Sequence, residues 1–222
     1  MSLKEKLDAF RAQVESGRRI PIAVVEQLHK STEELVASGQ AERAKKAGDR
    51  APTFELEDTN GRTINLTDLL VKGPVVLTFY RGVWCPYCNM ELQALEEARR
   101  DIEARGGQLV AISMQTAPNS RRSIEQNKLG FPILIDLHGI TANAYGLRFA
   151  LPDYLIDIYK NVFKNDLAVI NDDPSWTLPM PARYVIGQNS MIAYAEVNPD
   201  YTRRPEPVEL LPVLDRLGAL VA

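Results

Sequence analysis

The motif Cys85-Pro86-Tyr87-Cys88 constrains the fold of this chain more than any other stretch, because of what stands on either side of it. Residues 74–80 (PVVLTFY) are rich in valine, leucine and aromatic residues and show no polar alternation. Such a run is typical of a strand that is buried on both faces in a parallel sheet. From the motif onward, residues recur at helical spacings of three, four, three and seven, which places them on one stripe: Cys85, Cys88, Leu92, Leu95 and Ile102. The motif is therefore predicted to join a buried strand to a helix.

The start of a helix favours a reactive thiol. The first turn carries unpaired backbone N–H groups and the positive end of the helix dipole, so a thiolate at Cys85 is stabilised relative to the thiol. Pro86 suits the first helical position, where it removes no intrahelical hydrogen bond. The spacing of three lets Cys88 reach back to an oxidised Cys85, and Arg81 is close enough in sequence to add positive charge. We interpret the motif as a redox site.

Two other interpretations compete with a redox site, namely two reduced core cysteines or half of a metal site. The chain has two cysteines and two histidines, His29 and His138, which stand far from the motif in sequence. A complete zinc shell would require all four side chains to converge. The position of the motif at a strand-to-helix junction favours the redox interpretation, and we expect neither a metal nor a cofactor.

Composition excludes several other classes of protein. The formal net charge of the 222 residues is −3 and no long basic run is present, which disfavours nucleic acid or an anionic membrane as a partner. Two cysteines do not make a disulfide scaffold, so a bridge between them is more plausibly catalytic than structural. The first ten residues are polar and mixed in charge, and no later stretch approaches the length of a membrane span. A cytoplasmic location is the expectation.

The remaining periodicities predict an α/β domain with a helical extension. Residues 1–46 are expected to form two helices that act as a packing or dimerisation arm, with a restart of the second helix at a capping-box pattern in residues 31–34. The domain is expected to span residues 47–222. Its predicted elements are hairpins over 53–66 and 182–197, strands over 108–114 and 131–136, and helices over 120–128, 154–163 and 206–220. This order predicts a three-layer α/β/α sandwich around a mixed sheet, with an irregular insertion at 137–180.

These features resemble a known family. The chain looks like a thioredoxin-fold redoxin, specifically the peroxiredoxin-like family of alkyl hydroperoxide reductases and thiol-specific antioxidant proteins (AhpC/TSA). The resemblance covers roughly residues 46–220, with the segments 48–54, 66–70, 131–136 and 144–146 similar to the opening hairpin and the insertion of redoxins. By position, Cys85 resembles the peroxidatic cysteine of peroxiredoxins and the attacking cysteine of thioredoxins, and Cys88 resembles the thioredoxin resolving cysteine.

The chain also departs from the peroxiredoxin pattern. Peroxiredoxins carry a proline seven residues and a threonine or serine three residues before the peroxidatic cysteine, where this chain has Thr78 and Gly82. The activating arginine of the family would fall on Pro181, a position that instead resembles the cis-proline of thioredoxins. We therefore predict a cis Met180–Pro181 bond, against the alternative of an ordinary proline at the start of a strand. Arg81 or Arg183 would have to replace the lost arginine.

The resemblance implies an oxidoreductase and leaves three functions open. In the first, Cys85 attacks a hydroperoxide and Cys88 resolves the product as an intramolecular disulfide, which thioredoxin or glutathione reduces. In the second, the pair exchanges with a disulfide substrate. In the third, the pair is a non-catalytic redox sensor, and a homodimer is possible in each. Supporting roles are expected for Arg81, Trp84, Pro86, Tyr87, Pro181 and Arg183.

Overall fold

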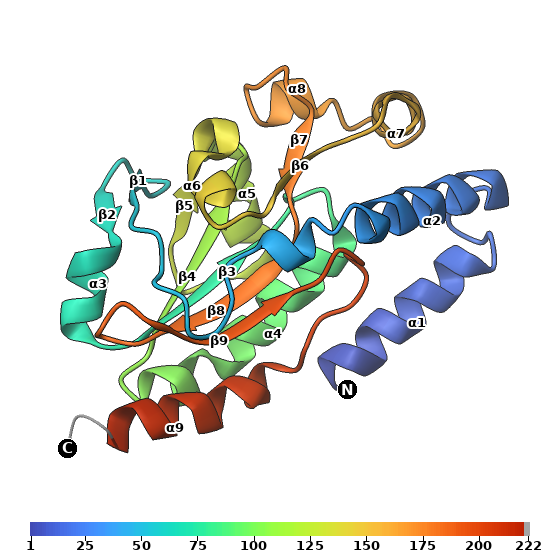
Figure 1. Ribbon diagram of the computed structural model, residues 1–222. Helices are drawn as coiled ribbons and strands as arrows, with labels where there is room; N and C mark the ends of the chain where they lie inside the picture. The colour runs from blue at the N-terminus through green and yellow to red at the C-terminus, as the bar shows by residue number, and fades with distance from the viewer. Residues whose placement is uncertain (220–222) are drawn as a thin grey trace.

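The computed structural model describes residues 1–219, and a five-stranded mixed sheet is its central layer (Figure 1). The strand order is β5-β4-β3-β8-β9, in which β3 (Val75–Phe79), β4 and β5 are parallel while β8 and β9 are antiparallel to their neighbours. The other strands are β4 (Gln108–Ser113), β5 (Ile133–Ile135), β8 (Ala182–Ile186) and β9 (Ile192–Val197). The predicted strands and the mixed sheet are confirmed.

The apolar run of β3 fills both faces of the sheet. Val76 and Tyr80 point to the core cluster that contains the cysteine helix, whereas Val75, Leu77 and Phe79 point to the cluster on the opposite face. All five of these side chains are fully buried. A strand that is covered on both sides has no polar face, which explains why this run lacks the alternation of a half-exposed strand.

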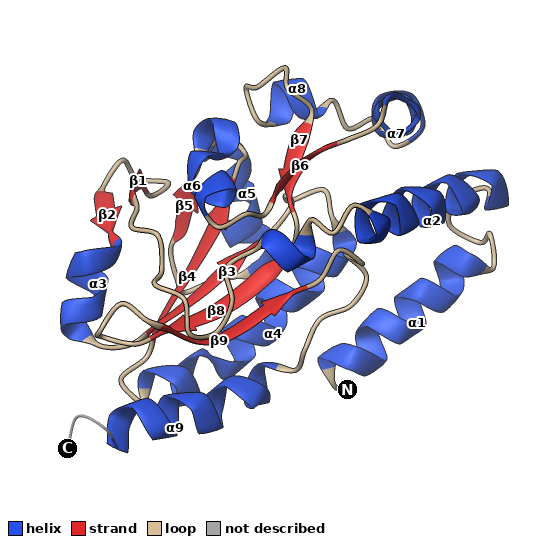
Figure 2. Ribbon diagram, viewed as in Figure 1, coloured by secondary structure: helices blue, strands red, loops and turns tan. Residues whose placement is uncertain are grey.

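Helices cover both faces of the sheet (Figure 2). Helices α4 (Pro86–Glu103), α5 (Ala117–Asn127) and α9 (Leu211–Ala219) contribute to the core on one face. Helices α3 (Leu66–Lys72) and α6 (Ile140–Ala144) contribute to the core on the other. The predicted three-layer α/β/α sandwich is confirmed. The short helical turns η2 (Leu137–Gly139) and η4 (Pro207–Leu210) precede α6 and α9, and Leu220, the predicted end of the last helix, lies outside the described residues.

A separate hairpin precedes the central strand, as predicted. Strand β1 (Glu55–Glu57) pairs antiparallel with β2 (Thr63–Asn65) around the turn at residues 58–61. The buried carboxylate of Asp58 closes this turn by accepting hydrogen bonds from the backbone N–H groups of Asn60 and Arg62, at 2.7 and 3.0 Å. The turn is therefore held by its first side chain as well as by Gly61.

The first 46 residues form α1 (Leu3–Glu15), α2 (Ile22–Ala37) and the turn η1 (Ala41–Arg43). Leu3 and Leu7 are buried in the core cluster that also contains residues of α4, so α1 packs on the cysteine helix. The predicted restart of the second helix is wrong, because α2 continues through it and the Thr32 hydroxyl donates to the carbonyl of Leu28 instead of capping a new helix.

The insertion forms a small unit beside the arm. Strand β6 (Arg148–Ala150) pairs with β7 (Thr177–Pro179), and between them lie α7 (Asp153–Asp157), the π-helical turn η3 (Ile158–Val162) and α8 (Leu167–Ile170). The apolar face predicted for residues 154–163 is buried against Leu28 of α2 through Leu155, Ile158 and Tyr159. Figure 1 shows α1, α2 and α7 gathered at the end of the sheet where α4 begins.

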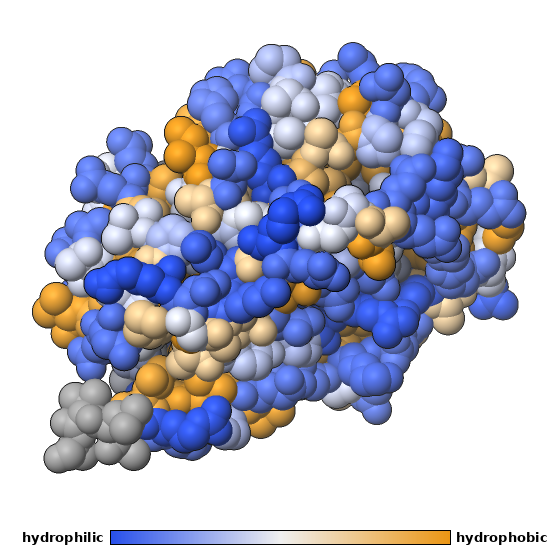
Figure 3. Space-filling view, in the orientation of Figure 1, coloured by the Kyte–Doolittle hydropathy of each residue, from blue (hydrophilic) through white to orange (hydrophobic). Residues whose placement is uncertain are grey.

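Two further observations concern surfaces. Among residues 1–219, no helix combines the length and the apolar composition that crossing a bilayer requires. Figure 3 shows that the face in view is mostly polar, with its apolar side chains in small separate groups.

Candidate active site

Cys85 is the residue that begins the cysteine helix. It occupies the N-cap of α4 with an extended backbone, and Pro86 takes the first helical turn. The backbone N–H of Cys88 donates to Sγ of Cys85 at a nitrogen–sulfur distance of 3.4 Å. This is the position of an N-cap acceptor, occupied here by sulfur instead of oxygen. Both cysteines are free thiols and almost completely buried, with 1% of Cys85 and none of Cys88 exposed.

Arg81 places a buried positive charge beside the cysteine pair. The side chain is 3% exposed and is held by three aromatic rings, with its guanidinium carbon 4.1 Å from the ring centre of Tyr201 and 5.1 Å from that of Trp84. The third ring is that of Tyr159, whose hydroxyl accepts a hydrogen bond from one terminal nitrogen of Arg81. Nε of Arg81 has no hydrogen-bond partner within residues 1–219. A buried cation acts on its neighbours through a low effective dielectric, so the charge of Arg81 favours an anion beside it.

A second arginine reaches the pair from the side of Cys88. Nη2 of Arg204 lies 3.8 Å from Sγ of Cys88. The carboxylate of Glu91, one turn after Cys88 on α4, pairs with Arg204 and also with Arg183, whose Nη2 lies 2.8 Å from Oε1 of Glu91. All three side chains are at most 3% exposed. The carboxylate thus compensates two buried cations and fixes one of them against the sulfur.

The two thiols differ in acidity. Burial alone raises the pKa of Cys85, but the hydrogen bond from the Cys88 thiol, the charges of Arg81 and Arg204, and the Cys88 backbone N–H together lower it to about 6. Burial and the hydrogen bond to Cys85 raise the pKa of Cys88 well above its ordinary value. Cys85 is therefore the more acidic thiol of the pair, and Cys88 holds its proton more tightly.

Cys85 lies at the wall of a cavity of about 340 Å³. The lining includes Arg81, Trp84, Pro86, Tyr87 and the insertion residue Tyr159, while the arm contributes residues of α1 and α2. The rings of Phe10 and Tyr87 meet edge to face at 5.1 Å, which joins α1 to the first turn of α4. The arm therefore forms part of the enclosure of the cysteine site.

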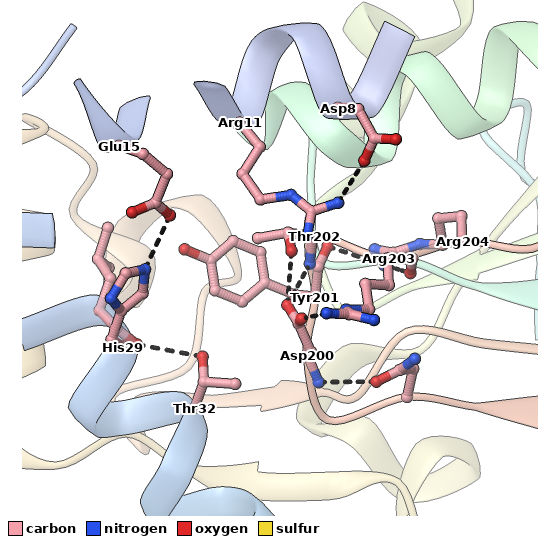
Figure 4. Close-up of polar contacts among 12 residues, drawn as sticks. Asp8, Arg11, Glu15, His29, Thr32, Asp200, Tyr201, Thr202, Arg203 and Arg204 are labelled. Atoms are coloured by element: carbon pink, nitrogen blue, oxygen red, sulfur yellow. Dashed lines mark hydrogen bonds and ion pairs between the residues drawn. The ribbon is translucent and has the colours of Figure 1, made fainter. Parts of the chain in front are cut away.

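A smaller cavity of about 250 Å³ shares Tyr87 and Tyr201 with the first in its lining, and Figure 4 shows the polar residues gathered around Tyr201. Charged side chains of α1, α2 and the segment 200–204 face one another there, and several are paired. Arg11 contacts Asp8 at 2.6 Å, His29 contacts Glu15 at 2.8 Å, and Arg203 contacts Asp200 at 2.9 Å. These pairs surround the ring of Tyr201, where the arm and the 200–204 segment meet.

Comparison with known proteins decides the family. The sequence model described as the AhpC/TSA family matches residues 47–195. The chain belongs to the AhpC/TSA family. Thiol-disulfide oxidoreductase ResA of Halalkalibacterium halodurans is 32% identical over 120 residues, which cover 54% of this chain and 67% of that protein. A protein of Mycobacterium tuberculosis named as a putative peroxiredoxin is 29% identical over 121 residues, covering 54% of this chain and 79% of that protein.

Solved structures of peroxiredoxins share the fold of this AhpC/TSA protein. Peroxidoxin BcpB from Mycobacterium tuberculosis has a TM-score of 0.60 at 22% identity and covers 77% of this chain and 97% of its own. A yeast mitochondrial 1-Cys peroxiredoxin has a TM-score of 0.61 at 21% identity and covers 80% of this chain and 78% of its own. The predicted family and the thioredoxin-like fold are confirmed. The named relatives are peroxiredoxins and thiol-disulfide oxidoreductases, so the prediction of a thiol-dependent oxidoreductase is also confirmed.

Within the AhpC/TSA fold, the missing hydroxyl before the cysteine has a structural reason. Gly82 has a φ of +154°, and a Cβ placed on it would lie 2.4 Å from Nε1 of Trp84. The indole therefore occupies the space that a threonine or serine would need at this position. Its N–H, like Nε of Arg81, finds no acceptor in the described part of the chain.

The expected supporting residues divide into two groups. Arg81, Trp84, Pro86 and Tyr87 line the cavity together with Cys85. Pro181 and Arg183 do not line it, because Arg183 pairs with Glu91 on the far side of Cys88. The predicted cis bond is wrong: Met180–Pro181 is trans, and the Pro181 carbonyl accepts from the Asn198 N–H at the end of the β8–β9 pair at 3.3 Å.

Sequence reasoning missed four residues that surround the cysteines: Glu91, Tyr159, Tyr201 and Arg204. A signal existed for Glu91, since it stands three residues after Cys88 on the inward stripe of the helix, where a carboxylate requires a cation. The other three come from segments that are distant in sequence and irregular in pattern. No group of three or more histidine, cysteine, aspartate or glutamate side chains with metal-site geometry occurs in residues 1–219.

Proposed function

We propose that this protein is a thiol peroxidase in which Cys85 is the peroxidatic cysteine and Cys88 the resolving cysteine. The Cys85 thiolate attacks one oxygen of a hydroperoxide, the O–O bond breaks, and the other oxygen leaves as an alcohol or as water after taking a proton from solvent. Cys85 becomes a sulfenic acid. The Cys88 thiol then attacks that sulfur, a disulfide forms and water leaves. A dithiol reductant supplies the two electrons that restore the pair.

One observation carries this proposal: the buried Arg81 guanidinium lies against the same cavity as Cys85. Its charge helps to lower the pKa of Cys85 to about 6, after the hydrogen bond from Cys88, so that the nucleophile is ionised at neutral pH. The same charge, on a residue that lines the cavity, stabilises the oxygen on which negative charge develops as the O–O bond breaks.

The remaining site residues position these groups. Glu91 holds Arg204 against Cys88, and Arg204 lowers the pKa of both sulfurs. Tyr159 fixes the guanidinium of Arg81 through its hydroxyl, and Tyr201 covers its face. Pro86 and Tyr87 complete the wall at the helix start. We infer no contact of Pro181 or Arg183 with substrate.

The second candidate is a thiol-disulfide oxidoreductase, which the similarity to ResA proteins favours. The matched region covers 63% to 67% of the length of the ResA relatives. The burial of Cys85, which is 1% exposed, favours a small substrate over a protein disulfide, because a folded partner would gain access to this residue only after the helices that cover it move. A small hydroperoxide needs no such access.

The partners and location are proposals of the same kind. A structure of the yeast mitochondrial 1-Cys peroxiredoxin is described as resolved through glutathione and thioredoxin systems, and we infer a reductant of that type here. We propose a cytoplasmic location, since two cysteines do not make the disulfide scaffold that is typical of small secreted domains. We retain a division into an arm at 1–46 and a domain at 47–222, and the possibility of a homodimer.

Stopped-flow mixing of the reduced protein with hydrogen peroxide or an organic hydroperoxide tests the proposal. Trp84 adjoins Cys85, so tryptophan fluorescence should report a fast oxidation that is absent in Cys85→Ser. Rate constants no larger than those of free cysteine with every hydroperoxide tried would overturn it. Insulin reduction with dithiothreitol tests the oxidoreductase alternative, and inactivity in both assays would favour the sensor.

A further inference from the structure

The arm that precedes the family region supplies part of the lining of the cavity over Cys85. The family model begins at residue 47, yet four apolar side chains of α1, α2 and their connection line the cavity. These side chains are Phe10, Val14, Ile20 and Leu28. Arg19 joins them by stacking its guanidinium carbon 4.6 Å from the centre of the Phe10 ring. The arm therefore contacts whatever fills the space in front of the sulfur.

The cavity is much larger than a molecule of hydrogen peroxide. Its volume is about 340 Å³, whereas a water molecule occupies about 30 Å³ in the liquid. Small-molecule sites begin at about 300 Å³ and are mostly apolar with a few convergent polar groups. A molecule of two oxygens would leave most of the apolar wall in contact with water, while an organic body would cover it.

The charge nearest the sulfur is that of Arg81, which lines the cavity together with Cys85 and helps to lower the pKa of that thiol. Arg19 and Asn165 are further polar residues of the lining. The arm side chains and Phe163 of the insertion add apolar surface to the same cavity. A ligand that fits has an oxygen acceptor at one end and a compact apolar body at the other.

We propose that the N-terminal arm is the specificity element of this peroxidase, with Phe10, Val14 and Leu28 forming the wall that receives the apolar body of an aryl or branched alkyl hydroperoxide. This inference rests on the proposed function. In the reaction the Cys85 sulfur bonds to the terminal oxygen of the hydroperoxide, the O–O bond breaks, and the alcohol leaves with a proton from solvent. The apolar body stays against the arm throughout, so the preference for such substrates depends on residues outside the family region.

Substitution at Val14 tests the proposal, because this half-buried residue faces the cavity from the last turn of α1. The measured quantity is the ratio of the second-order rate constants for cumene hydroperoxide and hydrogen peroxide, from stopped-flow fluorescence of the reduced full-length protein. In the wild type we expect a ratio of at least ~10, the size of an effect that apolar pockets provide. Val14→Phe should lower the ratio about tenfold by filling the cavity, and Val14→Ala should raise or preserve it.

Val36→Phe is the matched control, since Val36 is 57% exposed on α2 and does not line the cavity. It should keep the wild-type ratio. A wild-type ratio near one, or equal ratios in Val14→Phe, Val14→Ala and Val36→Phe, would overturn the role of the arm. If hydrogen peroxide still reacted rapidly in that case, the proposed peroxidase function would stand. If neither peroxide oxidised the protein faster than it oxidises free cysteine, the peroxidase function and the role of the arm would both be overturned.

Discussion

The backbone N–H of Cys88 points at Sγ of Cys85 from 3.4 Å, so the sulfur of the first cysteine caps the helix that carries the second. This relationship follows directly from the spacing of the motif, because an N-cap side chain accepts from the third residue after it. It gives the two sulfurs different roles. The position at the helix start stabilises the thiolate of Cys85 and lowers its pKa, whereas Cys88, one turn deeper, retains its proton.

The first prediction concerns the order of events at the two sulfurs. In Cys88→Ser the peroxide should still oxidise Cys85, but the sulfenic acid has no neighbour with which to condense. We expect one dimedone adduct per chain at Cys85, detected by peptide mass spectrometry, and loss of turnover with thioredoxin. The wild-type protein should instead show a Cys85–Cys88 disulfide within one chain. An unmodified and fully active Cys88→Ser variant would show that Cys88 does not resolve.

The second prediction concerns Arg81. Replacing it with methionine keeps the apolar stem but removes the charge and the free N–H. The pKa of Cys85 should rise, and the rate constant with hydroperoxide at pH 7 should fall at least about tenfold. The pH profile of alkylation by iodoacetamide measures the pKa. Arg100→Met, at an exposed position on α4, is the matched control and should behave as wild type. Equal profiles for both variants would remove Arg81 from the site.

The third prediction concerns Gly82. Restoring the hydroxyl typical of peroxiredoxins by Gly82→Ser should impair the protein, because the new Cβ would lie 2.4 Å from the Trp84 indole on a backbone with φ of +154°. We expect a loss of about 1–3 kcal/mol in the free energy of unfolding and a shifted tryptophan emission. Gly61→Ser is the control that separates backbone strain from the clash with Trp84. The φ of Gly61 is also positive, at +77°, but a Cβ placed on it meets no described atom within 4 Å. If Gly82→Ser kept the wild-type emission, the indole would not occupy this space.

The fourth prediction concerns the buried cluster beside Cys88. Glu91→Gln leaves Arg183 and Arg204 without a counter-charge, in positions that are at most 3% exposed. Removal of one partner from a buried pair typically costs about 3–5 kcal/mol, and we expect a loss of that size in urea unfolding. Glu97→Gln, whose side chain is 68% exposed on the same helix, should cost less than about 1 kcal/mol. Similar losses in the two variants would show that the cluster contributes little to stability.

The sheet and the reactive helix can be predicted from the sequence because their signals are local. The unbroken apolar run of β3 and the spacing of Cys85 and Cys88 each depend on a few neighbouring residues. The surroundings of the sulfurs are not local. Arg204 follows the last strand by several residues, and Tyr159 belongs to a π-helical turn within the insertion, so neither position has a periodicity that points to the site.

The errors have the same origin. The prediction of a cis bond at Pro181 rests on a positional likeness to thioredoxins, but the peptide bond is trans and the proline lies outside the cavity. The prediction of Arg183 as a substitute activator rests on its place in sequence, whereas its buried pair with Glu91 directs it away from Cys85. The arm shows only amphipathic periodicity in the sequence, which predicts helices but not the surface they cover. That the arm covers the cysteine site follows from the packing of α1 on α4.

The pH dependence of oxidation by hydroperoxide tests the central claim most directly. Cys85 is an acid whose pKa is lowered to about 6, so its reactive thiolate forms as the pH rises through that value. With cumene hydroperoxide in stopped flow, we predict a rate constant that rises about tenfold per pH unit below about pH 5, is half-maximal near 6 and is nearly constant from pH 7 to 8. A rate constant that is still rising at pH 8, as for an ordinary thiol, would contradict the claim that Cys85 is held ionised for attack on a peroxide.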